Sequence, residues 1–517
     1  MLSFSNERTL RHLMMKGMRW EIQKEVPQNS YDYFERTLIT GNGFREYDVR
    51  WLLGKEVNPN GFIVLGKSYG TYAKRVLKQN RVVVGHDFRK YSQDLCNAFI
   101  LGLLSTGVEV IDIGLALSPM LYFAQHLYNC PAGAMLTASH NENGWTGIKI
   151  AKGLSSTLEP DDIIAFRNIV EGGDYETGKG SYESVGNVYE EYTKDALKDG
   201  PLAKPLKIVV AAGNGTAGRF APGILRALGC EVIELDCTPD WDFKRYNPNP
   251  EDVAFLHNIS DATKSNGADL GIGIDGDGDR IGIVDDKGRE IFSDILGLLL
   301  ARWICPKHPG RAVVIDVKST GLFYDDPILK QGKTEIVTWK TGHSYIKAKG
   351  AETDALAGFE KSGHWFLNHP IGRGYDDAVL STVQFLRMLS AMGQPLSALN
   401  DALPKTWNSP TLGPYCADDA KYAVVDGIAA QYQQDKSNGV RVGGELIKEI
   451  ITVNGVRFVL SDDSWGLLRA SSNKPSLVIV AESRKSRDQM YDIVEHIQNR
   501  LAATGKTGEY DQTLPPR

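Results

Sequence analysis

Short apolar runs, rich in β-branched residues, recur along the chain, and each is followed by a polar or glycine-containing turn. They occupy residues 81–85, 207–212, 269–274 and 311–316. Continuous apolar strands of this length are typical of sheets that helices cover on both faces. The pattern therefore constrains the chain to an α/β fold built from strand–helix–strand units.

Helical patterns follow two of these runs. In residues 92–104, Leu95 and Phe99 lie four positions apart, and residues 218–228 have a similar spacing of apolar side chains, which predicts helices. The units recur about every 100 residues along a chain of 517 residues, so several similar α/β domains in tandem fit better than one large sheet. After residue 405 the pattern changes to strands of a smaller α+β unit, expected at residues 439–443, 447–453, 456–460 and 477–482.

Composition narrows the expected partners and compartment. The formal charge of −6 argues against a nucleic-acid ligand, because a phosphate backbone favours a concentrated basic face. The 6 cysteines form no CxxC pair and are too few and scattered for a disulfide framework. No run approaches the ~18 uninterrupted apolar residues of a membrane span. We therefore expect a cytoplasmic protein with no nucleic-acid and no membrane partner.

A serine lies in the turn after another apolar run. Residues 132–136 are apolar, and residues 137–147 that follow contain Ser139 among several Asn and Gly residues. A serine at the end of a strand is exposed and positioned by the backbone, and it becomes a nucleophile when a neighbouring group activates it. Taken alone, the segment also fits an ordinary turn in which the hydroxyl bonds to the backbone.

Three carboxylates alternate with glycines in Ile274-Asp-Gly-Asp-Gly-Asp-Arg280. Asp275, Asp277 and Asp279 can turn their oxygens toward one hard cation, and without a cation they would repel one another. An EF-hand calcium loop fits poorly, because Arg280 occupies the position that requires glycine. A cation site beside an arginine indicates that a phosphate binds there.

Two further segments carry polar side chains suited to a phosphosugar. In residues 358–364, Glu360 and Ser362 can accept from and donate to vicinal hydroxyls, and His364 can move a proton. In residues 465–475, Arg469 and the hydroxyl and amide groups that follow it suit a phosphate monoester. Each segment alone also fits a polar surface loop.

In this order, the four motifs resemble the α-D-phosphohexomutase superfamily, and most closely its bacterial phosphomannomutase/phosphoglucomutase branch. The resemblance extends over about residues 43–482 and includes residues 44–50, 316–320 and 340–344. It implies an α/β protein in which three tandem related domains with mixed sheets and a smaller C-terminal α+β domain surround a central cleft. The expected boundaries are an N-terminal extension at residues 1–38, the three α/β domains at 39–187, 188–292 and 293–404, and the C-terminal domain at 405–517.

The resemblance also implies roles for individual residues. Ser139 is expected to be phosphorylated in the active enzyme, and its phosphate to complete a Mg²⁺ site formed by Asp275, Asp277 and Asp279. The other catalytic residues that it implies are Arg50, Lys149, Arg280 and His364, with Lys149 and His364 as the candidates for proton transfer. The substrate-binding residues that it implies are Tyr47, His140, Asn141, Lys318, His343, Glu360, Ser362, Arg469, Ser471 and Asn473.

The sequence departs from the family pattern in three places. Glu142 stands where the serine loop usually has proline, which should leave that turn less rigid. Trp51 replaces a glycine, and residues 472–474 replace a more usual Asn-Thr-Thr, whereas Arg469 and Ser471 match the family pattern.

The implied activity is the interconversion of hexose 1-phosphate and hexose 6-phosphate, for mannose and also for glucose. It would proceed through phosphoserine and a hexose 1,6-bisphosphate, which is both intermediate and activator. A phosphoglucosamine mutase, a single-sugar phosphoglucomutase, a metal-dependent sugar phosphatase and an inactive binding paralogue remain as alternatives. The expected partners are phosphosugars, and the expected assembly is a monomer or a homodimer.

Overall fold

The computed structural model of the chain describes residues 36–472, 474–514 and 517. Nearly all of the predicted N-terminal extension, residues 1–38, and the predicted phosphate ligand Asn473 lie outside these residues. The chain divides into two compact units, the first ending at Glu190 and the second beginning at Glu191. Each unit is described below by itself.

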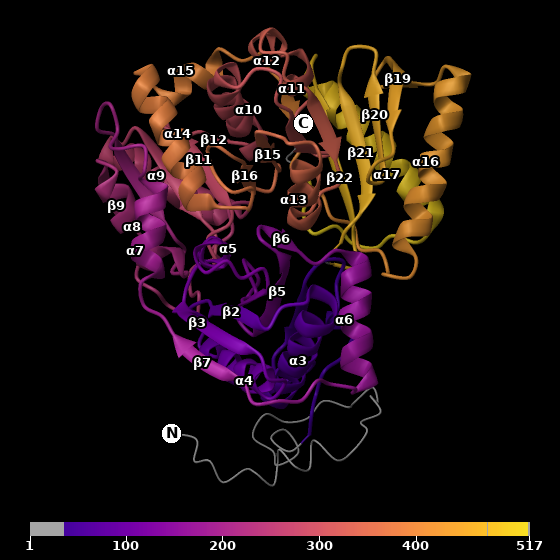
Figure 1. The fold of residues 1–517 in the computed structure, drawn as a ribbon. Coiled ribbons are helices and arrows are strands. Elements are labelled where there is room, and N and C mark those ends of the chain that lie inside the picture. The colour runs from indigo at the N-terminus through magenta and orange to yellow at the C-terminus, as the bar shows by residue number, and fades with distance from the viewer. Residues whose placement is uncertain (1–35, 473, 515–516) are drawn as a thin grey trace. The chain divides into compact units, whose positions relative to one another are not determined.

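The first unit is built on a mixed sheet with the strand order β1-β5-β4-β2-β3-β7 and with β6 beside β5 (Figure 1). Strand β2 pairs in parallel with β3 and β4, whereas β5 is antiparallel to β4 and to β1. The strands are β1 (Val49–Leu52), β2 (Arg81–His86), β3 (Glu109–Leu115), β4 (Gly133–Leu136), β5 (Trp145–Gly153), β6 (Ser156–Thr157) and β7 (Ser181–Ser184).

Helices cover both faces of this sheet. They are α3 (Pro59–Tyr72), α4 (Ser92–Leu104), α5 (Ser118–Leu127) and α6 (Pro160–Gly172), and α7 (Val188–Ala196) follows β7. Helices α3, α4 and α6 share one apolar core with alternate residues of the strands, and α5 lies on the opposite side of the sheet in Figure 1. Helices α3 and α4 lie so close together that a Cβ on Gly66 would be 2.0 Å from the backbone oxygen of Phe99. This close approach requires glycine at position 66.

Trp51 occupies the core of this unit. Its side chain is fully buried, its Nε1 donates to the backbone oxygen of Thr40 at 2.8 Å, and its ring meets the Phe44 ring edge-on. A Cβ on Gly43 would lie 1.9 Å from Trp51 Nε1. Gly43 therefore leaves room for the indole of Trp51. Position 51 is the one at which the resemblance predicts glycine.

The second unit contains two further α/β sheets. The first has the order β12-β11-β10-β8-β9, and the second has the order β14-β13-β15-β16. The strands are β8 (Lys207–Ala211), β9 (Glu231–Leu235), β10 (Leu270–Ile274), β11 (Ile281–Asp285), β12 (Glu290–Ile291), β13 (Val313–Asp316), β14 (Ile336–Trp339), β15 (Ala357–Phe359) and β16 (Trp365–Leu367). The helices are α8 (Ala217–Ala227), α9 (Val253–Asn266), α10 (Ser293–Ile304), α11 (Leu322–Asp325), α12 (Pro327–Gln331), α13 (His343–Glu352), α14 (Ala378–Met392) and α15 (Leu396–Asp401).

All three α/β sheets repeat one topology. A first strand (β2, β8 or β13) pairs in parallel with a second and a third strand, and the third pairs antiparallel with a fourth. The third and fourth strands are β4 and β5, β10 and β11, and β15 and β16. The predicted serine, metal and sugar loops each connect such a pair. Three chemically different loops therefore occupy the same place in three copies of one fold.

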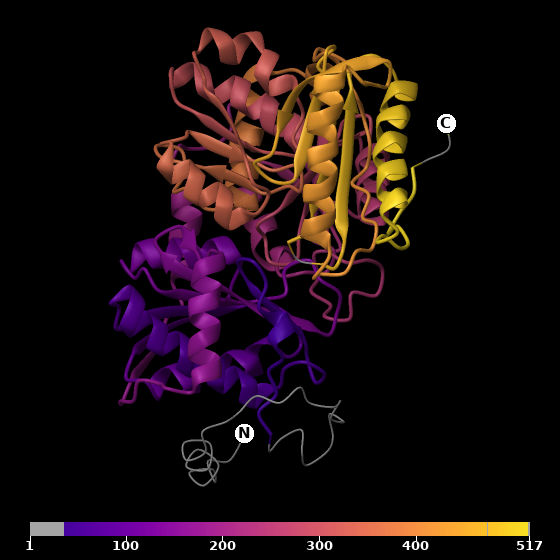
Figure 2. The same cartoon turned by 90° about the vertical axis from the view of Figure 1, so that its right-hand side faces the viewer.

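The C-terminal part of the second unit is an antiparallel sheet with the order β17-β22-β21-β20-β19-β18 (Figure 2). Its strands are β17 (Trp407–Asn408), β18 (Arg441–Val442), β19 (Glu445–Ile451), β20 (Val456–Leu460), β21 (Trp465–Ala470) and β22 (Leu477–Ser483). Helices α16 (Lys421–Asn438) and α17 (Arg487–Thr504) share an apolar core with one face. On the other face, Trp465 and Leu467 pack with Val317 of the preceding domain.

The predicted fold class is confirmed: three tandem α/β domains with mixed sheets precede a smaller C-terminal domain. The runs predicted as strands at residues 81–85, 207–212, 269–274 and 311–316 correspond to β2, β8, β10 and β13. The strand pattern missed β21, which carries the first part of the predicted phosphate loop. The domain boundaries stay a prediction. No helix in the described part of the chain is both long and apolar enough to cross a membrane.

Candidate active site

Ser139 lies in the turn that connects β4 to β5. Its backbone has a φ of 52°, in the left-handed region that side chains other than glycine rarely adopt. The Ser139 amide donates to Thr137 Oγ1 at 2.8 Å, and Ser139 Oγ lies 3.2 Å from Nδ1 of His140. Backbone held in such a region by its surroundings is frequent at active sites. The local geometry thus presents the serine next to a group that can exchange a proton.

Arg89 holds the serine turn through its backbone. The guanidinium donates to the carbonyl oxygens of Ser139 at 3.0 Å, Asn141 at 2.5 Å and Glu142 at 3.0 Å. It is buried, and its charge is balanced by Asp87, whose carboxylate lies 3.3 Å from Nε. These bonds restrain the turn at the position where Glu142 replaces the expected proline. The predicted lower rigidity of this turn stays a prediction, but the chain has a restraint that the sequence analysis did not identify.

The other predicted residues of the first unit lie on strands or in the same turn. Arg50 on β1 donates to Asn141 Oδ1 at 2.6 Å, and its guanidinium pairs with Asp48 at 2.7 Å. Lys149 lies on β5 opposite Met135 and is 3 % exposed. The structure therefore brings Arg50 to the serine turn through Asn141. Tyr47, which precedes β1, is also buried.

The predicted metal loop connects β10 to β11, which are buried throughout. Asp275, Asp277 and Asp279 are fully buried, and one oxygen from each lies within 4.8 Å of the others. Asp275 Oδ1 accepts hydrogen bonds from the amides of Gly278, Asp279 and Arg280 at 3.0–3.1 Å. These bonds fix the turn and leave an all-oxygen donor set, which suits a hard divalent cation. The residues present therefore fit the predicted metal.

Arg280 and His364 connect the metal loop with the sugar loop. Arg280 Nε lies 3.2 Å from His364 Nε2, which lies 3.5 Å from Asp279 Oδ1. On the other side of the ring, His364 Nδ1 lies 3.0 Å from Glu360 Oε2 and 3.3 Å from Ser362 Oγ. His364 thus contacts both of the other predicted residues of the sugar loop.

The protonation of His364 depends on the charges around it. Burial and the Arg280 guanidinium lower the pKa of His364, but the carboxylates of Asp279 and Glu360 outweigh them and raise it to about 9. A protonated Nε2 cannot accept a hydrogen bond from Arg280, so the contact between these two groups belongs to the neutral ring. Ligands that neutralise Asp279 or Arg280 therefore change the balance between donor and acceptor at His364.

Asp376 is a buried carboxylate beside this cluster that the sequence analysis missed. One of its oxygens accepts from Lys347 Nζ at 3.0 Å, and the other lies 3.9 Å from His343 Nδ1. Oxygens of Asp376 and Asp279 and a nitrogen of His364 lie within 4.8 Å of one another. The predicted residue His343 thus lies close to the His364 cluster, with ring centroids 6.0 Å apart. Sequence offered one signal, the adjacent acidic pair at residues 376–377 immediately before α14.

Lys318 lies in the loop after β13, and residues of the C-terminal sheet hold that loop. The buried Arg457 donates to the backbone oxygens of Val317 and Ser319, both at 2.8 Å. Glu482 accepts from the amide of Gly321 at 2.9 Å. Lys318 Nζ is 4.0 Å from Asp316. The C-terminal domain therefore supports a predicted substrate-binding loop of the third α/β domain.

Arg469 and Ser471 form a separate group in the C-terminal domain. Arg469 is the penultimate residue of β21 and is 6 % exposed, and its buried Nε has no hydrogen-bond partner among the described residues. Lys421 Nζ donates to the backbone oxygens of Ser471 at 2.6 Å and Lys474 at 3.2 Å. Lys421 thus bonds to the backbone of described residues on both sides of the predicted ligand Asn473.

Arg89 and Lys421 show which functional residues a motif search overlooks. Arg89 follows the end of a central parallel strand, where ligand-binding side chains often collect, so its position was a usable signal. Lys421 lies about 50 residues before the turn that it holds, and no local pattern connects the two. Among the predicted residues, those of the first unit are Tyr47, Arg50, Ser139, His140, Asn141 and Lys149, and the others belong to the second.

Comparisons with known proteins agree with this arrangement. Residues 41–176, 190–288 and 292–407 match α/β/α domains I, II and III of the phosphoglucomutase/phosphomannomutase family. A phosphomannomutase/phosphoglucomutase of Pseudomonas aeruginosa is 34% identical over 91% of this chain and 96% of that protein. A phosphoglucomutase of Neisseria meningitidis is 33% identical over 89% of this chain and 96% of that protein.

A solved structure gives the same result. The crystal structure of a phosphoglucomutase/phosphomannomutase family protein from Burkholderia thailandensis superposes with a TM-score of 0.81 at 30% identity, covering 93% of this chain and all of that one. The chain belongs to the phosphoglucomutase/phosphomannomutase family, within the α-D-phosphohexomutase superfamily. It is therefore an enzyme of the phosphotransferase type of isomerase.

The carboxylate cluster predicts a measurable cation affinity. Replacing Asp277 by Asn removes one charge from three buried donors, so we expect Mn²⁺ to bind at least ~10-fold more weakly. Electron paramagnetic resonance titration of free Mn²⁺ measures this without an activity assay. Asp261→Asn, at a side chain that is 78% exposed, is the matched control. An unchanged Mn²⁺ affinity in the Asp277 variant would show that this cluster is not the metal site.

The contacts of Arg89 predict a positioning role. Arg89→Ala removes charge-assisted bonds to three carbonyl oxygens of the serine turn, so we expect kcat to fall about 10–100-fold while KM changes little. Arg89→Lys should recover part of kcat, and Arg81→Ala, at a side chain that is 43% exposed, should behave as wild type. Steady-state kinetics and thermal melting of all variants separate positioning from stability. A loss confined to the melting temperature would contradict the role.

Proposed function

We propose that the enzyme interconverts hexose 1-phosphate and hexose 6-phosphate, using both mannose and glucose phosphates, with Ser139 as the carrier of the transferred phosphoryl group. The observation that carries this proposal is the contact of a buried three-carboxylate cluster with an arginine, Arg280, and with a sugar-type loop through His364. A hard cation and a guanidinium side by side suit a phosphoryl group in transfer. The names of the relatives support the same reaction.

The residues that would hold Mg²⁺ are Asp275, Asp277 and Asp279, together with the phosphate on Ser139. When bound, Mg²⁺ supplies positive charge that offsets the negative charge of the phosphoryl oxygens. The donors of this site are all oxygens, which favour such a hard ion over zinc. The proposed activator is hexose 1,6-bisphosphate, which would phosphorylate Ser139 in enzyme that lacks the phosphate.

The chain's own residues perform the transfer in both directions. The bond from phosphorus to Ser139 Oγ breaks as the bond to the sugar hydroxyl forms, and the hydroxyl proton passes to a base, for which Lys149 and His364 are the candidates. The bisphosphate then reorients in the site so that its two phosphoryl groups exchange places. Its other phosphoryl group returns to Ser139 Oγ with the reverse proton movement. Arg50 and Arg280 place positive charge beside the reacting groups. No water is consumed.

The remaining residues bind the part of the substrate that does not react. Glu360 and Ser362 are suited to the sugar hydroxyls by donor and acceptor type. Arg469 and Ser471, with Asn473 as a further candidate, would bind the phosphate that does not react. Tyr47, His140, Lys318 and His343 would contribute further contacts.

Ser139 carries the central kinetic prediction. Because Ser139→Ala removes the covalent carrier rather than one hydrogen bond, we expect kcat to fall at least ~10³-fold. A coupled assay of glucose 6-phosphate formation from glucose 1-phosphate measures this. Ser181→Ala, at an exposed strand position, is the control. A Ser139 variant with more than about a tenth of wild-type turnover would refute the proposed carrier.

The predicted phosphate loop of the C-terminal domain contains two basic residues that should have unequal effects. The planar guanidinium of Arg469 can hold a phosphate through two bonds, whereas Lys474 is exposed. Arg469→Ala should mainly raise KM, by a loss of about 2–4 kcal/mol in kcat/KM. Lys474→Ala should change kcat/KM by less than about threefold. Equal losses in the two variants would show that the phosphate is held in another way.

The reorientation of the bound bisphosphate predicts that the enzyme uses both mannose and glucose phosphates. Since the sugar must bind in two orientations, the residues that grip it must contact hydroxyls that present alike in both. Mannose and glucose differ at carbon 2, and none of the proposed site residues is assigned to the hydroxyl there. The kcat/KM values for the two sugars should therefore differ by no more than about tenfold.

Parallel assays with mannose, glucose and glucosamine 1-phosphates, primed with the same bisphosphate, measure this ratio. Glu360→Ala should reduce turnover of mannose and glucose substrates to a similar degree. A preference above ~10³-fold for one of them would assign a single-sugar enzyme, since a site built around one hydroxyl reaches such ratios. Release of inorganic phosphate at the rate of turnover would instead assign a phosphatase.

A further inference from the structure

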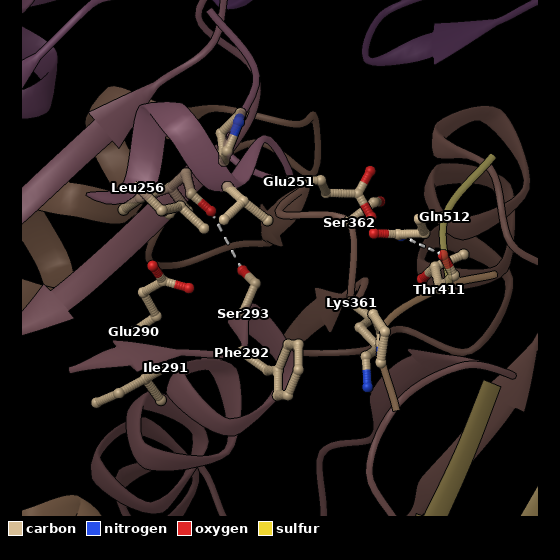
Figure 3. Close-up of a pocket in the computed structure, with 15 residues that line it drawn as sticks. Glu251, Leu256, Glu290, Ile291, Phe292, Ser293, Lys361, Ser362, Thr411 and Gln512 are labelled. Atoms are coloured by element: carbon tan, nitrogen blue, oxygen red, sulfur yellow. Dashed lines mark hydrogen bonds between the residues drawn. The ribbon is translucent and has the colours of Figure 1, made fainter. Parts of the chain in front are cut away.

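A cavity of about 260 Å³ lies in the second unit beside the sugar loop. Its wall includes Leu256 of α9, Phe292 before α10, Lys361 of the sugar loop, and Thr411 and Gln512 of the C-terminal domain. Figure 3 shows these side chains around an open space, with Leu256 on one side and Thr411 and Gln512 on the other. Apart from Ser362, the residues that line this cavity have no role in the proposed mutase reaction.

Lys361 brings a buried ammonium to the cavity wall, and this charge interacts electrostatically with the buried carboxylate of Asp294 without a hydrogen bond. The residue is 5 % exposed, and its Nζ has no hydrogen-bond partner among the described residues. The ammonium lies 4.3 Å from the centre of the Phe292 ring, and Figure 3 shows the two side chains next to each other. A cation–π contact of this kind replaces only part of the hydration that a buried ammonium loses.

The acidic residues of the cavity wall already have basic side chains as neighbours. Glu251 lies 3.5 Å from Arg280, and Glu290 lies 3.3 Å from His257. Among the charged groups that line the cavity, Lys361 is therefore the one that forms neither a hydrogen bond nor an ion pair with a described side chain. An anion in the cavity would satisfy this charge, and the apolar side chains around it would take an apolar body.

We propose that this cavity binds a small monocarboxylate with an apolar body. The carboxylate accepts from Lys361 Nζ, and the body packs against Phe292, Ile291 and Leu256. One ammonium balances one negative charge, so a monoanion fits this wall better than a dianionic sugar phosphate.

The cavity is connected to the substrate site through shared residues. Ser362 lines the cavity and lies 3.3 Å from His364, and Glu251 lines the cavity and pairs with Arg280. Lys361 itself separates Glu360 from Ser362 in the chain. A ligand here contacts the sugar loop at Lys361 and Ser362, so its binding and that of the substrate affect each other reciprocally.

Phenylpropionate is a suitable probe, with its neutral amide, phenylpropanamide, as the matched compound. Isothermal titration calorimetry on the full chain should show one phenylpropionate per chain and about 10–100-fold weaker binding of the amide. Lys361→Met keeps the apolar stem and should weaken phenylpropionate by a similar factor. Lys485→Met, at a side chain that is 61% exposed, is the control and should bind as wild type. Saturating glucose 1,6-bisphosphate should shift the affinity without abolishing the binding.

A second variant keeps the proposal testable if Lys361→Met does not fold. Thr411→Trp fills the cavity from its rim and retains the backbone oxygen to which Gln512 Nε2 donates at 2.6 Å, and it should abolish phenylpropionate binding. Three results would each overturn the proposal. They are no binding to wild type, unchanged binding in a folded Lys361→Met or Thr411→Trp variant, and strict competition with the bisphosphate.

Discussion

Three fully buried carboxylates whose oxygens lie within 4.8 Å of one another are the constraint on which the second unit's chemistry depends. Like charges this close repel strongly away from water, so the surrounding groups must offset them. Three backbone amides bond to Asp275, and Arg280 and His364 place positive or protonatable nitrogens next to Asp275 and Asp279. The remaining negative charge is what a divalent cation would neutralise. This balance explains why the metal loop, Arg280 and the sugar loop form one contiguous cluster.

The repeated sheet topology explains where the functional loops lie. In each α/β domain, the loop between the third strand and its antiparallel partner carries a different chemistry, a serine, a carboxylate cluster or a sugar-binding set. The loop after the first strand carries a basic residue in two of the copies, Arg89 after β2 and Lys318 after β13. Duplication of one fold therefore supplies several loops at equivalent positions, and each loop can change without altering the sheet that holds it.

Much of this arrangement could be predicted from the sequence because its signals are local. The apolar runs predicted β2, β8, β10 and β13, and the spacing of Asp275, Asp277 and Asp279 predicted the carboxylate cluster. Strand β21 was missed because its residues were interpreted through Arg469 as a phosphate loop, although Trp465–Ala470 is a strand buried throughout. The supports of the loops, Arg89, Lys421 and Arg457, depend on contacts between distant segments. A single sequence does not encode such contacts in any spacing, and the roles given to individual site residues stay predictions.

Covalent phosphorylation of Ser139 tests the central claim most directly. The enzyme is incubated with glucose 1,6-bisphosphate and Mg²⁺, quenched in acid, and its intact mass and peptide map are measured. The account predicts a mass increase of one phosphoryl group, located on Ser139, which disappears after an excess of glucose 1-phosphate is added to the unquenched enzyme. An unphosphorylated Ser139 in a preparation that turns over, or a phosphoryl group on another residue, would contradict it.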